Sequence, residues 1–313
     1  MRGSMKIFGG NSNPALHQAI CDALDVLPGR ALVGSFSDGE VRVEIHENVR
    51  GKDVYLVQST CRPINQNIVE LLVLIDAVKR ASAWRINVVV PYYGYGRKDQ
   101  KDRPRVPITA KLVADLMSVA GAHRIIAVDL HANQIQGFFN IPVDNLFAAK
   151  ALLQDLQERF GSDAVIVAPD AGGVERARAF AKRLSADLAI IDRRYGGEQG
   201  GDAWRMVGDV RGRTVVILDD MIDTGKTLIR AIESAIAAGA TEIHAHCVHP
   251  VLSGGAIDKL EHAPLASLTV TDTIPLSSDA AACRKIRVIS VAPLLAEAIR
   301  RVHNEESVSS LFV

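Results

Sequence analysis

The sequence is poor in aromatic residues and has no excess of either charge. Aromatic residues make up 5% of its 313 residues, whereas apolar residues make up 48%. An apolar fraction rich in Ala, Val, Ile and Leu is typical of a parallel α/β protein. Lysine and arginine together number 36, as do aspartate and glutamate, so the formal net charge is zero. This balance argues against nucleic acid as the main partner, because domains that bind nucleic acid are usually basic.

Cysteine is scarce, and long apolar runs are missing. The four cysteines lie far apart and form no C-x-x-C pair: Cys21, Cys61, Cys247 and Cys283. This spacing indicates reduced thiols and argues against a disulfide framework or a zinc site. No apolar run reaches about 18 residues, and no signal peptide precedes the first predicted strand. We therefore expect a cytoplasmic protein with no membrane partner.

Strand-like runs alternate with helical runs along the whole chain, which predicts parallel sheets. Residues 54–90 and residues 215–248 share one plan, in which a strand is followed by a polar loop, a helix and a second strand. We interpret the repeat as two related α/β domains, over residues 5–148 and 149–313. The tail, residues 303–313, ends in apolar residues and is expected to dock back onto the protein.

Residues 215–227 carry the strongest functional signal. Val215–Leu218 is predicted to be a strand, followed by Asp219, Asp220 and Asp223, then by Thr224-Gly225-Lys226-Thr227 and a helix over Leu228–Ala238. Ligands of open α/β sheets bind beyond the carboxyl ends of strands, and a helix start offers unpaired N–H groups to phosphate. Acidic residues there suit sugar hydroxyls or a hydrated metal. The run therefore predicts a site for a phosphorylated sugar.

Two alternatives explain this run less well. A capped strand-to-helix turn needs one acidic residue, whereas three within five residues repel one another. A Walker A phosphate loop needs a glycine five residues before its Gly-Lys pair, and that position is Asp220.

Two further strand ends carry polar clusters. Asp129-Leu130-His131 follows a strand over Arg124–Val128, and we expect both polar side chains to extend from one face of an extended chain as ligand or metal contacts. A structural histidine is the alternative. Asp170 and two glycines follow a strand over Ala164–Ala168, which would let a ligand approach the backbone closely. A plain glycine-rich turn is the alternative there.

Two loops complete the predicted site. Residues 91–107 carry five basic residues behind three tyrosines, which favours stacking and cation contacts with a nucleotide over a merely solvated face. Residues 192–204 contain four glycines and begin with Asp192-Arg193-Arg194, which is typical of a mobile lid that closes over phosphates.

Residues 219–227 resemble the phosphoribosyl diphosphate (PRPP) binding motif of type I phosphoribosyltransferases and PRPP synthetases. The chain as a whole resembles the ribose-phosphate pyrophosphokinase (PRPP synthetase) family from about residue 5 to residue 312. The most specific motifs, besides residues 219–227, are Phe36-Ser37-Asp38-Gly39-Glu40, Tyr95 to Lys111, Val128 to His131, Gln134 to Phe139, Pro169 to Gly173, Thr273-Ile274-Pro275 and Glu306 to Ser309.

The resemblance implies two phosphoribosyltransferase-like domains, each with a mostly parallel sheet flanked by helices. It also implies a reaction in which ATP and ribose 5-phosphate give AMP and PRPP with Mg²⁺. In that reaction the sugar's C1 hydroxyl attacks the β-phosphorus of ATP.

Site roles follow from the matching motifs. Phe36 of a neighbouring subunit would stack on adenine, and Asp38 and Glu40 would contact the edge of the base. Arg97, Lys98 and His131 would also contact ATP. The metal would be held by His131 and Asp170. Asp219 and Asp220 would hold the ribose hydroxyls, and residues 223–227 would wrap the 5-phosphate. Arg193 and Arg194, with His131, would be the catalytic residues.

The chain departs from the family pattern at several places, one of which is the effector position Asn48, where serine is usual. Lys98 stands where glutamine is usual, and Lys226 stands where a small residue is usual in the phosphate loop. The lid reads Arg193-Arg194-Tyr195, whereas the family has Lys, one residue and then Arg. The changed lid and Lys226 favour, as an alternative, a catalytically weak regulatory subunit. A phosphoribosyltransferase that consumes PRPP is a third hypothesis, and the basic loop at residues 97–105 speaks against it.

Family members also form hexamers and bind inhibitory ADP and activating inorganic phosphate at a subunit interface. The resemblance therefore predicts a homo-oligomer in which the effector positions are Asn48, Arg50, Asn133, Asn145, Ser307, Ser309 and Phe312.

Overall fold

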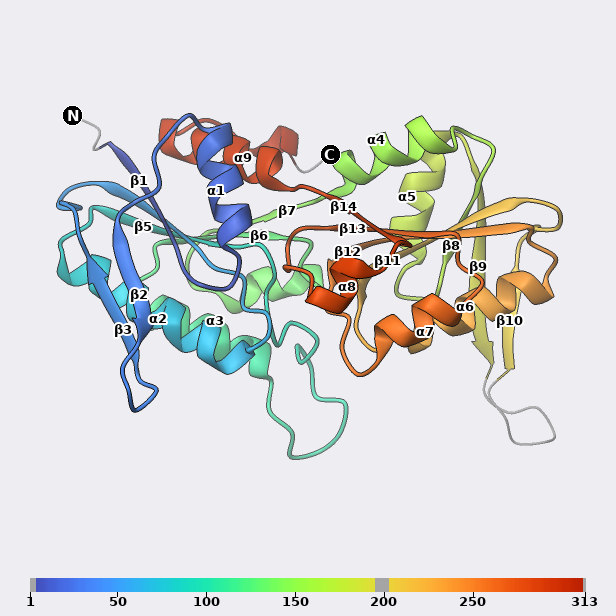
Figure 1. The fold of residues 1–313 in the computed structure, drawn as a ribbon, viewed down its shortest axis with the longest axis horizontal. Coiled ribbons are helices and arrows are strands. Elements are labelled where there is room, and N and C mark those ends of the chain that lie inside the picture. The colour runs from blue at the N-terminus through green and yellow to red at the C-terminus, as the bar shows by residue number, and fades with distance from the viewer. Residues whose placement is uncertain (1–3, 195–202, 312–313) are drawn as a thin grey trace. The chain divides into compact units, whose positions relative to one another are not determined.

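The computed structural model describes residues 4–194 and 203–311, and the chain divides into two compact units (Figure 1). Unit 1 comprises Met1–Phe147, Thr273–Pro275 and Ser290–Val313. Unit 2 comprises Ala148–Asp272 and Leu276–Ile289. The last helix of the chain therefore belongs to the same unit as the first strand.

Unit 1 is built on a parallel sheet with the strand order β1-β4-β5-β6-β7. Its strands are β1 (Met5–Gly9), β4 (Asp53–Val57), β5 (Arg85–Val90), β6 (Arg124–Val128) and β7 (Val143–Leu146). Each strand pairs in parallel with its neighbour. A separate antiparallel hairpin joins β2 (Ala31–Ser35) to β3 (Val41–Ile45).

Helices cover both faces of this sheet (Figure 1). One face carries α1 (Pro14–Ala23) and α9 (Ala292–Asn304), which pack on each other. The other carries α2 (Ile64–Arg80) and α3 (Thr109–Ala120). Two 3₁₀ helices are η1 (Asn133–Phe138) and η2 (Ser309–Leu311). The central strands β4, β5 and β6 are buried on both faces, which explains the runs of Val and Ile in β5 and β6.

A buried polar cluster attaches α9 to the amino ends of β4 and β5. The carboxylate of Asp53 is fully buried and accepts hydrogen bonds from Arg85 Nε (2.9 Å) and Nη2 (2.6 Å) and from Asn87 Nδ2 (2.8 Å). His303 Nδ1, in the last turn of α9, lies 2.8 Å from the same carboxylate. Arg85 Nη2 also donates to the carbonyl of Val302 (3.3 Å). A buried charge is retained only when it is paired in this way.

Unit 2 is built on a larger sheet with the strand order β10-β9-β8-β11-β12-β13-β14. Its strands are β8 (Val165–Ala168), β9 (Asp187–Arg194), β10 (Ala203–Val207), β11 (Thr214–Ile222), β12 (Glu242–Pro250), β13 (Ser267–Thr271) and β14 (Ile286–Ile289). Pairing is parallel except between β9 and β10, which are antiparallel.

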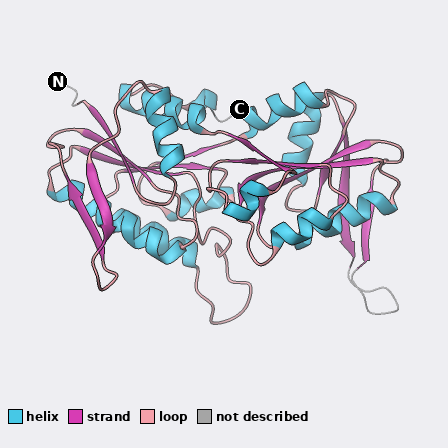
Figure 2. Cartoon of the chain, viewed as in Figure 1, coloured by secondary structure: helices cyan, strands magenta, loops and turns pink. Residues whose placement is uncertain are grey.

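Helices also lie on both faces of the second sheet (Figure 2). They are α4 (Ala149–Arg159) and α5 (Val174–Leu184) on one face, α6 (Lys226–Ala237) and α7 (Ala256–His262) on the other, and the short α8 (Ser278–Ala282). The core beneath α6 combines strand residues such as Val215 and Ile217 with Leu228 and Ile232 of the helix.

The structure confirms the predicted α/β class with a mostly parallel sheet in each unit. Among the described residues, no helix combines the length and the apolar character needed to cross a membrane. The predicted bounds of the strand and helix within residues 215–238 were wrong. The strand predicted over Val215–Leu218 continues to Ile222, and the helix predicted from Leu228 begins at Lys226.

Candidate active site

Asp219 and Asp220 are strand residues and not loop residues. On one side of β11, pairing with β8 ends at Ile217. On the other side, pairing with β12 continues through Ile222, opposite Pro250. The longer neighbour therefore keeps the chain extended past the predicted end of the strand. Both carboxylates lie where the ladder with β8 has stopped, at the carboxyl end of the sheet, where α/β proteins bind ligands.

Three carboxylates share this place in unit 2. Asp220 is 8% exposed and Asp219 is partly buried. Burial, the neighbouring charge and hydrogen bond of Asp220, and the charge of Asp170 hold the pKa of Asp219 well above its usual range. Arg176 opposes this shift, with its Nη1 3.9 Å from Asp220 Oδ1. The site therefore carries excess negative charge, which suits a cation or hydroxyl donors.

Asp170 lies in the turn between β8 and α5. Its side chain is exposed, and its Oδ1 accepts a hydrogen bond from the N–H of Gly173 (3.0 Å). A Cβ added to Gly172 would lie 3.3 Å from that oxygen, and one added to Gly173 would lie 3.4 Å from the ring of Pro169. The two glycines therefore let the turn fold tightly around the carboxylate, as their pairing in the sequence suggests.

The predicted phosphate-loop residues lead directly into α6. Gly225 precedes the helix with φ 73°, a left-handed conformation that favours glycine. Lys226 and Thr227 are the first two helical residues, and the N-cap residue, Gly225, has no side chain with which to cap the amides of this first turn. Lys226 is exposed. A cation is unfavourable at a helix N-terminus unless an anion accompanies it, so this position is suited to a phosphate.

His131 and Arg97 belong to adjoining loops of unit 1. A Cβ added to Gly96 would lie 3.7 Å from His131 Cβ, and Gln134 Nε2 donates to Asp99 (3.1 Å). The structure thus brings the basic loop beside the segment that follows β6. Lys98 lies 3.6 Å from Asp102, and its carbonyl accepts a hydrogen bond at the start of α3.

The predicted extended geometry of residues 129–131 was wrong. Asp129 has φ 42°, so the chain turns at this residue. The turn is held by the N–H of Asp129, which donates to the carbonyl of Leu146 (2.8 Å), and by the N–H of Leu130, which donates to Asn145 (3.0 Å). Asp129 is consequently 5% exposed while His131 is exposed, so the two residues differ in environment.

Phe36, Asp38 and Glu40 form the tip of the β2–β3 hairpin. Phe36 is 50% exposed, and the guanidinium of Arg42 lies 5.7 Å from its ring centre. Asp38 Oδ1 accepts from the N–H of Glu40 (3.1 Å), and the N–H of Phe36 donates to the carbonyl of Glu40 (2.8 Å). These local hydrogen bonds fix the tip and leave the Phe36 ring available for stacking.

The predicted effector residues fall into small groups within unit 1. Asn48 accepts from the N–H of Arg50 (3.0 Å), and Asn145 Nδ2 donates to Asn133 Oδ1 (3.3 Å). Ser307 Oγ donates to Ser309 Oγ (3.0 Å). Phe312 lies outside the described residues.

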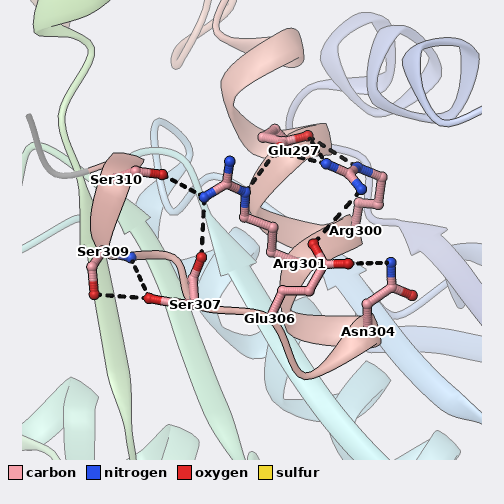
Figure 3. A network of polar contacts seen from close by, with 8 residues as sticks. All are labelled: Glu297, Arg300, Arg301, Asn304, Glu306, Ser307, Ser309 and Ser310. Carbon is pink, nitrogen blue, oxygen red and sulfur yellow. Dashed lines mark hydrogen bonds and ion pairs between the residues drawn. The ribbon is translucent and has the colours of Figure 1, made fainter.

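An arginine holds the serine pair in place (Figure 3). Arg301 Nη1 donates to the carbonyl of Ser307 (3.0 Å) and to Ser310 Oγ (2.5 Å). Its Nε donates to Glu297 (2.6 Å), so the guanidinium joins the end of α9 to the tail that follows it.

Part of the lid predicted over residues 192–204 consists of two paired antiparallel strands. Arg193 and Arg194 belong to β9, where they pair with Trp204 and Ala203 of β10, respectively. Residues 192–194 and 203–204 are therefore strand and not loop. Tyr195 and the glycine-rich residues that follow it, to residue 202, lie outside the described residues.

One residue of the acidic site, Arg176, was not predicted from the sequence. Arg176 lies in the first helical turn of α5, three residues after Gly173. A basic residue there opposes the helix dipole, which was the available signal. Among the described residues, no group of three or more His, Cys, Asp or Glu side chains could hold a metal ion by itself.

Comparisons with known proteins cover almost the whole chain. Residues 5–121 match the N-terminal domain of ribose phosphate pyrophosphokinase, and residues 198–313 match the phosphoribosyl synthetase-associated domain. The ribose-phosphate pyrophosphokinase of Ralstonia nicotianae is 52% identical over 309 residues, which cover 98% of each chain. That of Bordetella pertussis is 53% identical over 307 residues, covering 98% of this chain and 99% of its own.

A solved structure agrees with these relatives. The crystal structure of phosphoribosylpyrophosphate synthetase from Mycobacterium smegmatis aligns with a TM-score of 0.91 and 40% identity, covering 96% of this chain and 99% of that one.

Proposed function

The chain belongs to the ribose-phosphate pyrophosphokinase family, and from this premise we propose how its residues carry out the reaction. The enzyme is a ribose-phosphate diphosphokinase, which transfers the diphosphoryl group of ATP to the C1 hydroxyl of ribose 5-phosphate and releases AMP. The observation that carries the assignment of the acceptor side is the acidic end of β11, followed within a few residues by the glycine-initiated start of α6.

The acceptor is held from both ends. Asp219 and Asp220 accept hydrogen bonds from the ribose hydroxyls, which relieves the crowding of negative charge seen in the raised pKa of Asp219. Asp223, Thr224, Gly225, Lys226 and Thr227 hold the 5-phosphate through backbone amides and the Lys226 ammonium. Such fixed contacts orient the C1 hydroxyl for in-line attack on the β-phosphorus.

The nucleotide is held by unit 1 residues. Phe36 stacks on adenine, Asp38 and Glu40 contact the edge of the base, and Arg97, Lys98 and His131 contact the phosphates. This assignment is supported by the exposure of Phe36 and by the proximity of Gly96 to His131. Phe36 acts on the site of a neighbouring subunit in a homo-hexamer.

Mg²⁺ is the proposed cofactor, and the donor chemistry of this chain fits it. Mg²⁺ is usually held by one or two carboxylates plus substrate phosphates, so a cluster of three protein ligands is not required. Asp170 offers an exposed carboxylate beside a site with excess negative charge, and His131 lies among the proposed nucleotide contacts. When bound, the ion neutralises charge on the transferring phosphates.

Arg193 and Arg194 supply positive charge to the transferring group. Arginine keeps the charge of the usual lysine but has a planar, more weakly hydrated head. If Arg193 acts in the transition state, Arg193→Ala should lower kcat far more than it changes KM. Equal activity of the mutant would remove this residue from the mechanism.

The decisive assay is AMP release from ATP in the presence of ribose 5-phosphate and Mg²⁺. A catalytically weak regulatory subunit is the second candidate, and the Arg193-Arg194-Tyr195 lid favours it. That candidate predicts binding of ribose 5-phosphate without turnover. Restoring the family pattern with Tyr195→Arg would then raise the rate.

Regulation and location are also part of the proposal. ADP and inorganic phosphate act at a subunit interface through Asn48, Arg50, Asn133, Asn145, Ser307, Ser309 and Phe312. The protein works in the cytoplasm, with neither nucleic acid nor a membrane as partner. The hydrogen bonds within these pairs support a pre-formed polar surface.

A further inference from the structure

The phosphate loop of unit 2 rests on the turn between β12 and α7. The N–H of Leu252 donates to the carbonyl of Ile222 (2.9 Å), and the N–H of Ser253 donates to the carbonyl of Asp223 (2.9 Å). Ser253 Oγ also donates to the carboxylate of Asp223. The two loops are therefore joined by backbone and side-chain hydrogen bonds at the residue where the phosphate loop begins.

The supporting turn has an uncommon backbone. Leu252 has φ 47°, and Gly254 and Gly255 have φ 58° and 73°. A leucine in the left-handed region is sterically unfavourable, and such residues persist where surrounding contacts enforce them, often at ligand clamps. The two hydrogen bonds to Ile222 and Asp223 are contacts of this kind.

Lys259 adds a charged contact between the same two loops. Its Nζ donates to the carbonyl of Thr224 (2.8 Å) and approaches that of Gly254 (3.4 Å). In a trans peptide the carbonyl and the following N–H point in opposite directions. By holding the Thr224 carbonyl toward α7, Lys259 turns the Gly225 N–H toward the other side of the loop.

We propose that Lys259 is a positioning residue for binding of ribose 5-phosphate, acting on the peptide between Thr224 and Gly225 while Ser253 holds the preceding residue, Asp223. It sets the direction of a loop amide and touches no substrate atom itself. The proposal rests on the proposed role of residues 223–227 as the 5-phosphate loop.

The chain offers a matched control in Lys285. Its Nζ donates to three carbonyls at the other end of α7, those of Leu260 (2.9 Å), Glu261 (2.8 Å) and Ala263 (2.7 Å). Both lysines are partly buried and both tie α7 to neighbouring backbone. Removing either ammonium therefore weakens the same helix, but only Lys259 contacts the carbonyl of Thr224.

The test is calorimetric titration of ribose 5-phosphate into the full-length wild type, Lys259→Met, Lys259→Arg and Lys285→Met. We expect Lys259→Met to raise Kd by roughly tenfold to hundredfold, the range for a lost hydrogen bond to a charged group. Lys259→Arg should recover most of the affinity. Lys285→Met should bind like the wild type, although its melting temperature falls as that of Lys259→Met does.

Equal Kd values for Lys259→Met and Lys285→Met would overturn the proposal, as would an increase in KM for ATP equal to that for ribose 5-phosphate. A wild type that binds ribose 5-phosphate but releases no AMP would count against the proposed function alone, since the Kd comparison still decides the role of Lys259. A wild type that does not bind ribose 5-phosphate overturns both.

Discussion

Replacing Asp219 with asparagine should stabilise unit 2 at neutral pH while weakening its binding of ribose 5-phosphate. Burial, Asp220 and Asp170 raise the pKa of Asp219, so keeping its carboxylate ionised costs free energy in the folded protein. Asparagine retains the Oδ1 atom that accepts the N–H of Asp220 (2.9 Å) but carries no charge. Sites that bind ligands are often strained in this way, and their neutralisation exchanges function for stability.

The sign of the effect follows from the linkage between ionisation and folding, because the folded protein must keep a repelled carboxylate ionised. Single substitutions that stabilise a protein commonly contribute about 0.5–2 kcal/mol, and we expect a gain in this range. Each kcal/mol raises Tm by roughly 2–4 °C in a domain of this size. Because the folded pKa exceeds the unfolded value of about 3.9, the folded wild type binds more protons between these two values. Its stability therefore falls as pH rises through that window.

Calorimetric unfolding at pH values of about 4 and about 8 tests this reasoning. The variant should gain little over the wild type at the lower pH and the full amount at the higher pH. Asp187→Asn is the control, because Asp187 is 71% exposed and pairs with Arg213 at the surface. It should change stability by about 0.5 kcal/mol or less. An Asp219→Asn protein that is less stable than the wild type at both pH values would refute the argument.

Other contacts give further predictions. Asp53→Asn should lower the free energy of unfolding of unit 1 by about 3 kcal/mol, measured in urea, because it breaks a buried ion pair with Arg85; a loss below about 1 kcal/mol would contradict this. Burial raises the pKa of Asp155, but the hydrogen bond from His246 and two nearby arginines lower it to about 2. Wild-type stability should therefore fall as pH drops from about 4 toward 2, and Asp155→Asn should lose that part of the acid dependence. Arg301→Ala should release the C-terminal tail, seen as faster proteolysis there and a weaker response to phosphate; unchanged cleavage would contradict the role assigned to this arginine.

Much of the fold could be predicted because the signals are local. The strand at Arg124–Val128 has the predicted bounds, since Gly121 precedes its apolar run and Asp129 follows it. The end of β11 could not be found locally. Asp219 and Asp220 have low strand propensity, and what extends the strand to Ile222 is pairing with β12, a contact distant in sequence.

The site was predictable in its residue types but not in its geometry. The acidic run and the glycines at residues 172–173 identified the loops that form it. The left-handed turn at Asp129 depends on hydrogen bonds to Leu146 and Asn145, which the sequence does not bring together. The contact between Lys259 and the Thr224 carbonyl could likewise not be predicted, because a lysine on a short helix ordinarily has a solvated side chain.

The most direct measurement of the central claim follows the β-phosphorus of ATP. With ATP labelled at that position, ribose 5-phosphate and Mg²⁺, the account predicts that the label appears in PRPP in equal amount to the AMP released. Label retained in ADP would show transfer of a single phosphoryl group, and label retained in ATP would show no transfer. Either result would contradict the assignment of this chain as a ribose-phosphate diphosphokinase.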